Sequence, residues 1–185
     1  MLVGTWHIIL WSRNLLITTI ADLDILIDKL EASQPIKTEK TFYEWVKDPP
    51  DVQCPQLTIL SAEDSTKFEL AYRLGASGRA KSIIGKWDRG IDGEYLWRLA
   101  PTLSMQLCVS YGETPNPALV DTIVLTEIGS IPPCDNVIVL SKRFDPTHVS
   151  SVRDFLEERH VESAFNKLVK IHCTMNEINT NTITR

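Results

Sequence analysis

The sequence predicts a single α/β domain in which short apolar strands alternate with amphipathic helices. Residues 137–140 form the apolar run VIVL, which is the clearest strand in the chain. Asp145 and Pro146 follow this run and are typical of the start of a helix. The apolar residues of this helix fall on one face: Val149, Val152, Phe155 and Leu156. A second apolar run, LTIL at residues 57–60, precedes a segment of helical composition, so the order of strand and helix recurs.

The composition is that of one ordinary globular domain. The 185 residues are 43% apolar and 23% charged, which excludes a disordered or fibrous chain. A chain of this length buries enough surface to fold without a disulfide or a metal. The formal net charge is -5. The chain is therefore a poor candidate for binding nucleic acid alone, because phosphate neutralisation supplies most of that affinity.

The cysteines and the longest apolar runs predict where the protein resides. The cysteines are scattered and form no CxxC pair: Cys54, Cys108, Cys134 and Cys173. This spacing predicts reduced core thiols and no metal site. No run reaches about 18 apolar residues, so neither a signal peptide nor a membrane span is expected. We therefore expect a soluble, intracellular protein with no membrane partner.

The first half of the chain is predicted to contain two strands and two helices. Residues 2–11 are dense in β-branched and aromatic residues and predict a buried strand, which residues 17–20 continue in extended form. After Asp22, a short helix places these residues on one face: Leu23, Leu26, Ile27 and Leu30. Residues 41–46 fit either a short helix or a strand. Residues 57–60 form a strand, and 67–74 a helix that Gly75 ends.

Residues 75–136 are predicted to be an insertion or an irregular segment. Glycine and basic residues at 75–93 favour a loop around Ile83 and Ile84. Two strand-like runs follow, at 95–99 and 105–111, and the prolines at 112–117 require a turn. Residues 120–128 fit either a strand or a helix. After the helix at Asp145, a further helix at 162–168 leads into an apolar run at 169–173.

No arrangement of side chains predicts catalysis. The four histidines lie in no nucleophile elbow and in no metal-binding motif: His7, His148, His160 and His172. His148 and His160 fall on predicted helices beside charged residues, where we expect them to be solvated. We therefore expect a protein that is not an enzyme, with no catalytic residue, no metal and no cofactor.

Residues 57–74 have the order of a phosphate-binding loop, with a strand, a polar loop ending in lysine, and a helix. Such a loop normally carries G-x-x-x-x-G-K-[ST], because glycines let backbone N–H groups surround the phosphates. The residues of this vestigial loop are Ser61, Glu63, Asp64, Thr66, Lys67 and Phe68. Ser61 and Thr66 replace the two glycines, and Phe68 replaces the hydroxyl that holds magnesium. Nucleotide binding is therefore expected to be lost.

In three places, the chain resembles the small eukaryotic paralogues of the RecA-type recombinase. Residues 17–26 resemble the lead-in of that family, and residues 57–74 its phosphate loop and helix. Residues 137–146 resemble its second core strand, and 168–173 its third. The resemblance implies one domain, 1–185, with an atypical or incomplete RecA-like core sheet flanked by helices. A second register instead uses 107–111 as the first core strand and 112–117 as a degraded loop.

The resemblance also implies a function. Such proteins are non-catalytic subunits that form a heterodimer with another recombinase paralogue. They remodel or stabilise recombinase filaments on single-stranded DNA during homologous recombination and DNA repair in the nucleus. Single-stranded DNA would be contacted only indirectly or weakly.

Two groups of residues are candidates for these contacts. The interface candidates are Phe68, Ala71, Arg143 and Phe144, of which Phe68 and Ala71 fit the F-x-x-A docking pattern of the family. The candidates for contact with single-stranded DNA or a filament are Lys81, Lys86, Trp87 and Arg89. They lie in a basic, glycine-punctuated segment, and stacking with phosphate pairing requires this mixture; a plain surface loop is the alternative. The competing function is a small α+β protein-binding module, such as a toxin-neutralising immunity protein.

Overall fold

The computed structural model describes residues 3–31, 51–61, 66–75, 80–89, 94–100, 103–111, 118, 121–127, 136–159 and 167–173. These residues form nine strands and two helices. In the first part of the chain the elements are β1 (Gly4–Ser12), α1 (Arg13–Glu31), β2 (Val52–Ser61), β3 (Thr66–Leu74) and β4 (Ala80–Arg89). The remaining elements are β5 (Glu94–Ala100), β6 (Leu103–Tyr111), β7 (Thr122–Glu127), β8 (Val137–Ser141), α3 (Pro146–Glu158) and β9 (Leu168–Lys170).

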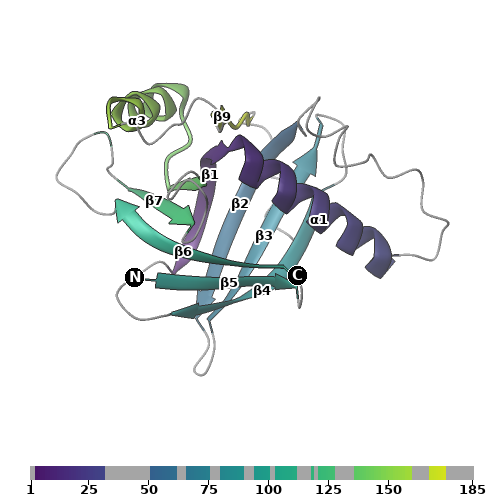
Figure 1. Ribbon diagram of the computed structural model, residues 1–185. Helices are drawn as coiled ribbons and strands as arrows, with labels where there is room; N and C mark the ends of the chain where they lie inside the picture. Colours follow the sequence, from purple (N-terminus) through teal and green to yellow (C-terminus); the bar gives the residue numbers. More distant parts are fainter. Residues whose placement is uncertain are drawn as a thin grey trace.

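The strands form one closed antiparallel barrel (Figure 1). Strands β2 to β8 neighbour one another in sequence order, and β1 pairs with both β8 and β2, which closes a ring of eight strands. β9 adds to the second half of β1. The predicted α/β class with a RecA-like core is therefore wrong. Each named strand pair is antiparallel, whereas an α/β core requires parallel strands joined by helices.

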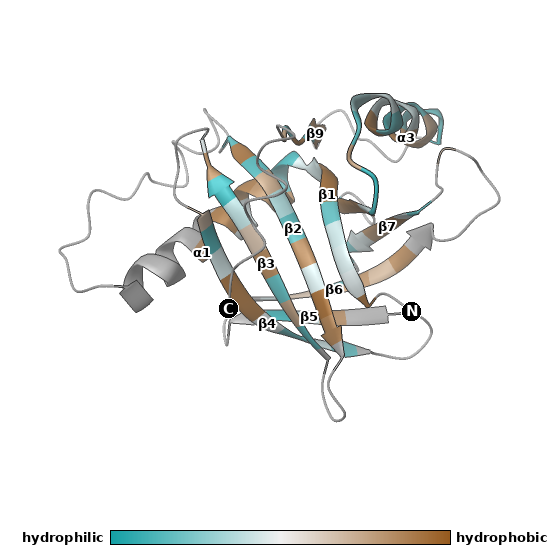
Figure 2. Cartoon of the chain, turned by 180° about the vertical axis from the view of Figure 1, so that it is seen from behind, coloured by the Kyte–Doolittle hydropathy of each residue, from teal (hydrophilic) through white to brown (hydrophobic). Residues whose placement is uncertain are grey.

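β3 shows why the predicted helix at 67–74 is a strand. Phe68, Leu70 and Tyr72 are buried in the barrel, whereas Lys67 is exposed and Glu69 is half-buried. This alternation has the period of two that a strand requires. β3 pairs with β2 so that Leu57 lies opposite Leu70. In Figure 2, hydrophobic and hydrophilic bands alternate along these two strands.

Residues 75–136, the predicted insertion, contribute β4, β5, β6 and β7 to the barrel. The loop predicted around Ile83 and Ile84 is wrong, because β4 pairs with β3 on one side and β5 on the other. Gly85 on β4 faces inward where only glycine fits. A Cβ atom there would collide with the Phe68 ring and lie 2.7 Å from the Arg98 carbonyl oxygen. The glycine that favoured a loop in the sequence is thus explained by close packing within a strand.

Helix α1 follows β1 directly and covers the barrel core. Residues 17–20, predicted to be extended, lie inside this helix, while the helix expected after Asp22 is its second half. Four buried residues of α1 belong to the same apolar cluster as the barrel interior: Leu15, Leu16, Ile20 and Leu23. The described helices include none that is long and apolar enough to cross a membrane.

Helix α3 covers one outer wall of the barrel, and its prediction is confirmed. The Asp145 carboxylate accepts a hydrogen bond from the His148 backbone N–H at 2.8 Å, and Pro146 is the first helical residue. The apolar face of α3 packs on outward-facing side chains of β1, β7 and β8: Ile9, Leu10, Val124, Val137 and Val139. Strand β8 is buried on both faces for this reason, which explains its uninterrupted apolar sequence.

Two cysteines form a disulfide, Cys54 on β2 with Cys173 after β9. The expected reduced state is therefore wrong for this pair. The Sγ atom of Cys108 lies 3.0 Å from the Thr126 hydroxyl oxygen, and Cys134 lies outside the described residues. The backbone supports the bond, because the Cys54 N–H donates to the His172 carbonyl at 3.1 Å.

Candidate functional site

The barrel interior is unusually aromatic. Its largest buried side chains include six aromatic rings: Trp6, Trp11, Phe68, Tyr72, Trp87 and Trp97. Three of them, which we call the aromatic group (Phe68, Trp87 and Trp97), pack closely together. The ring centroids of Trp87 and Trp97 are 4.8 Å apart, and those of Phe68 and Trp97 are 5.2 Å apart. The interior wall at β3–β5 is therefore a flat-faced aromatic surface.

Within the described part of the chain, two indole groups of this interior have no hydrogen-bond partner. Trp11 and Trp97 are each 1% exposed, and the Nε1–H of each lacks an acceptor among the described residues. A buried indole N–H usually finds an acceptor, because leaving one unpaired costs about 1–3 kcal/mol.

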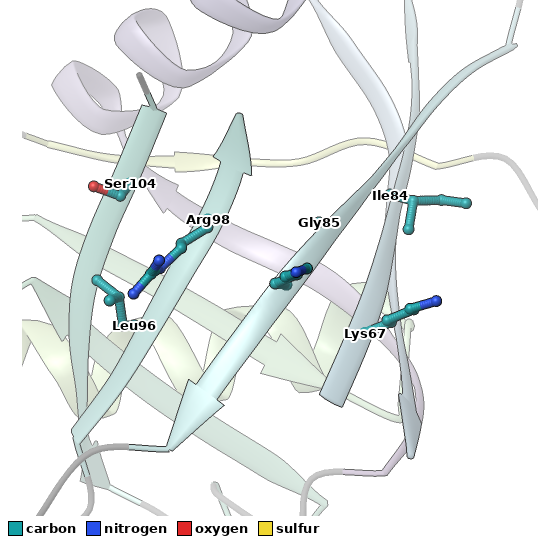
Figure 3. Close-up of a pocket in the computed structure, with 7 residues that line it drawn as sticks. Lys67, Ile84, Gly85, Leu96, Arg98 and Ser104 are labelled. Atoms are coloured by element: carbon teal, nitrogen blue, oxygen red, sulfur yellow. The ribbon is translucent and has the colours of Figure 1, made fainter. Parts of the chain in front are cut away.

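A second candidate site lies on the outside of the barrel. It is a pocket of about 600 Å³ on the outer face of β3–β6, and we call it the outer pocket. Figure 3 shows most of its lining side chains on these strands. The lining residues are Lys67, Ile84, Gly85, Lys86, Leu96, Arg98 and Ser104.

The strand register aligns four of the lining residues in one row. Lys67 lies opposite Lys86, Lys86 lies opposite Arg98, and Arg98 lies opposite Ser104. Three cations therefore stand side by side on three neighbouring strands, and we call them the cation row. Arg98 forms an ion pair with Asp88 at 3.3 Å. Within the described part of the chain, Lys67 and Lys86 form none.

A buried polar network joins α3 to the barrel. The Nε2 atom of His148 lies 3.0 Å from the Thr122 hydroxyl and 3.1 Å from the Ser141 hydroxyl. Burial lowers the pKa of His148; the Arg143 charge adds to this, and Asp145 and Asp121 oppose it. The expectation that His148 is solvated is wrong, since the residue is 9% exposed. Away from both candidate sites, the network holds the base of α3 in place.

The residues predicted as a vestigial phosphate loop do not form one. Ser61 and Thr66 are paired residues at the ends of β2 and β3, and Glu63 and Asp64 lie outside the described residues. Lys67 is exposed on the outer face of β3, whereas Phe68 points into the barrel. Because residues 66–74 form the strand β3, they provide no helix N-terminus to hold phosphates.

The predicted interface residues are dispersed. Phe68 is fully buried, so it is not exposed for docking, and Ala71 is half-buried on β3. Arg143 forms an exposed ion pair with Asp121 at 3.3 Å. Phe144 is half-buried, and its ring centroid lies 5.7 Å from that of His7.

The predicted DNA-contact residues all lie on β4, but on different faces. Trp87 belongs to the aromatic group inside the barrel, whereas Lys86 is exposed in the outer pocket. Lys81 is half-buried, and Arg89 is the last residue of the strand. The structure thus brings together Lys67 and Lys86, which the sequence had assigned to two different functions.

Several site residues escaped the sequence analysis. No motif in the sequence marks Arg98 or Ser104 as a site residue, because each joins the cation row only through strand pairing. The available signal was the alternation of apolar and polar residues at 80–89 and 94–100. A period of two predicts strands in both segments and places Lys86 and Trp87 on opposite faces of the first strand.

Together, the closed eight-stranded barrel, the helix on its outer wall and the short ninth strand define a lipocalin-like β-barrel. Solved structures with this architecture include lobster apocrustacyanin A1, with a TM-score of 0.56 and 10% identity over 98% of this chain and 83% of that one. The cockroach major allergen Per a 4 has a TM-score of 0.51 and 8% identity, over 92% and 85% of the two chains. No protein-family model matches the sequence, and no curated protein matches it.

These similarities correct the identification as a recombinase paralogue. The neighbours are lipocalin-like barrels, so the RecA-type resemblance is wrong. The predicted assignment to homologous recombination and DNA repair is therefore wrong, as are the predicted partners, a second paralogue and a recombinase filament. The three motifs matched short apolar runs that occur in any packed domain.

Proposed function

We propose that this chain is a binding protein that holds a small, neutral, largely apolar ligand inside its barrel. The observation that carries the proposal is the pair of buried indole N–H groups, on Trp11 and Trp97, that have no acceptor among the described residues. Eight-stranded barrels have interiors of a size that can hold one small ligand. Of the two predicted functions, the barrel fits the binding-module alternative better, although that module was expected to be α+β.

The interior suggests the chemistry of the ligand. A charged group would lose its hydration among apolar side chains, so a neutral molecule is favoured. The aromatic group offers flat faces to a planar ring system. A carbonyl oxygen or a ring nitrogen would accept from one of the two indoles. We therefore propose a planar, apolar molecule with one such acceptor.

We also propose that the protein binds its ligand without catalysing a reaction. The nuclear location was predicted only from the recombinase resemblance. The Cys54–Cys173 disulfide instead supports an oxidising compartment, because such bonds are rare in the cytosol and nucleus.

The proposal is tested with two matched probes, 2-acetylnaphthalene and 2-ethylnaphthalene, of which only the first carries an acceptor. In ¹⁵N-labelled protein, we expect the acetyl compound to shift the Nε1–H signal of Trp11 or Trp97, and the ethyl compound to shift it much less. Replacing the responding tryptophan (Trp11→Phe or Trp97→Phe) should weaken binding of the acetyl compound by about threefold to tenfold, as expected for one hydrogen bond.

Trp87→Phe is the matched control. It makes the same tryptophan-to-phenylalanine change at the ring that packs against Trp97. It should lower the affinity for both probes to the same extent. If neither probe shifts either indole signal, the proposed interior site is wrong.

A further inference from the structure

The outer pocket carries a second inference, independent of the interior site. We propose that the cation row binds the head group of a free organic anion, whose apolar body lies against the barrel wall. The ligand class is a carboxylate, sulfate or phosphate monoester with an aliphatic or aromatic body. Lys67, Lys86 and Arg98 would hold the head group.

The geometry of the row suits an oxyanion. Side chains directly opposite each other on antiparallel strands have Cβ atoms about 5 Å apart. The pairs Lys67–Lys86 and Lys86–Arg98 meet this condition. An anion above Lys86 is therefore within reach of all three cations. Ser104 ends the row and adds a hydroxyl group.

Among the residues that the structure describes, Lys67 and Lys86 have no ion-pair partner, whereas Arg98 pairs with Asp88. Like charges directly opposite each other destabilise a sheet, yet the row contains two such pairs in succession. The chain as a whole has a net charge of -5, so the row does not follow from a basic composition. Asp88 pairs with Arg98, whereas Glu69 forms no ion pair with any residue that the structure describes. A bound anion would offset the repulsion between Lys67 and Lys86.

Apolar side chains flank the row on both sides. Ile84 lies two residues before Lys86 on β4, and Leu96 lies two residues before Arg98 on β5, which runs the opposite way. The two residues are therefore on opposite sides of the row but on the same face of the sheet. Ile84 is 67% exposed, which is unusual for isoleucine and gives an apolar body a contact surface.

The size of the pocket favours a free small molecule. A volume of about 600 Å³ is within the range of about 300–1,000 Å³ that is typical of small-molecule sites. A nucleic acid would require a much larger basic surface, and the acidic net charge opposes it. A membrane surface is flat, whereas the pocket is concave.

The test uses octyl sulfate, kept below its micelle concentration, and octyl glucoside, which has the same chain with a neutral head. Calorimetry measures affinity, and ¹⁵N NMR locates binding. We expect octyl sulfate to bind at least tenfold more tightly than octyl glucoside and to shift the backbone amides of residues 84–86 and 96–98. Its affinity should fall as salt is added.

The decisive variant is Lys67→Gln with Lys86→Gln. The matched control is Lys167→Gln with Lys170→Gln, which removes the same charge at β9, away from the pocket. The first pair should weaken octyl sulfate binding at least tenfold, and the control less than twofold. Equal effects of the two pairs would overturn the proposal, as would binding only to anionic phosphatidylglycerol vesicles and not to monomeric octyl sulfate.

The same spectra separate this proposal from the interior site. Octyl sulfate bound inside the barrel would shift the Trp11 or Trp97 indole signals and leave residues 84–86 unchanged, which would overturn the outer site. Failure of the naphthalene probes would leave the octyl sulfate result unaffected.

Discussion

Two walls of the same barrel differ in what covers them. Strands β1, β7 and β8 are packed under α3, and their outward side chains are apolar and buried, as at Val139. In the described residues, β3 to β6 have no such helix, and their outward side chains include Lys67, Lys86 and Arg98. The difference shows that the outer face is apolar where a helix covers it and carries charged side chains where none does. The inner face is apolar in both walls.

The covered wall is expected to be highly sensitive to charge, and the open wall tolerant. Val152→Asp on α3 buries a carboxylate without a partner and should lower the free energy of unfolding by about 3–5 kcal/mol. Ile84→Asp places the same side chain on the open wall, directly opposite Glu69, and should lower the free energy of unfolding by about 1 kcal/mol or less. Urea denaturation measures both. Similar losses in the two variants would contradict the comparison.

The covered wall should also respond to pH through His148. Burial lowers the pKa of this imidazole in the folded protein below its ordinary value of 6.5. The unfolded chain therefore binds the proton more readily, so stability falls as pH drops below about 6.5 and stops falling below the folded pKa.

Replacement of His148 tests this pH dependence. His148→Gln should reduce the slope of unfolding free energy against pH between about 7 and 5. Burial also lowers the pKa of His7. The contribution of His7 to the slope should therefore remain in the variant. The measurement is urea denaturation across this pH range, and an unchanged slope in the variant would exclude His148 as its source.

A small gain in stability is expected from removing one charge on the open wall. Lys86→Gln removes the central charge of the cation row and should raise stability by about 0.2–1 kcal/mol, because two like-charge contacts are lost. Thermal unfolding at low salt measures this gain, which should shrink at high salt. The gain would mean that the row is maintained at a cost to folding. A loss of stability would show that Lys86 stabilises the wall.

The covered wall was the predictable part of the fold. The run at 137–140 is apolar on both faces because α3 covers its outer face. Asp145, only a few residues later in the sequence, marks the start of that helix. Local signals were sufficient for both elements. The resulting pattern of a buried strand followed by a helix is also the pattern of an α/β core, which is why the class was wrong.

The open wall was not predictable from local signals. Residues 67–74 contain good helix formers such as Glu69, Leu70 and Ala71, and only pairing with β2 and β4 makes them a strand. Lys67 and Lys86 were each identified as candidates, but for separate functions. Their alignment depends on a register between distant residues, and Arg98 joins them through a second such register.

The disulfide described above has a mechanical consequence. It joins Cys54 to Cys173, so β2 to β9 lie on one covalent ring, whereas β1 and α1 lie on a tail outside that ring. The tail fastens the barrel, because β1 pairs with β2, β8 and β9. Tension applied at the N-terminal end would peel β1 away first and leave the ring as an open sheet. The edges of β2 and β8 that β1 pairs with would then carry unpaired backbone N–H and C=O groups.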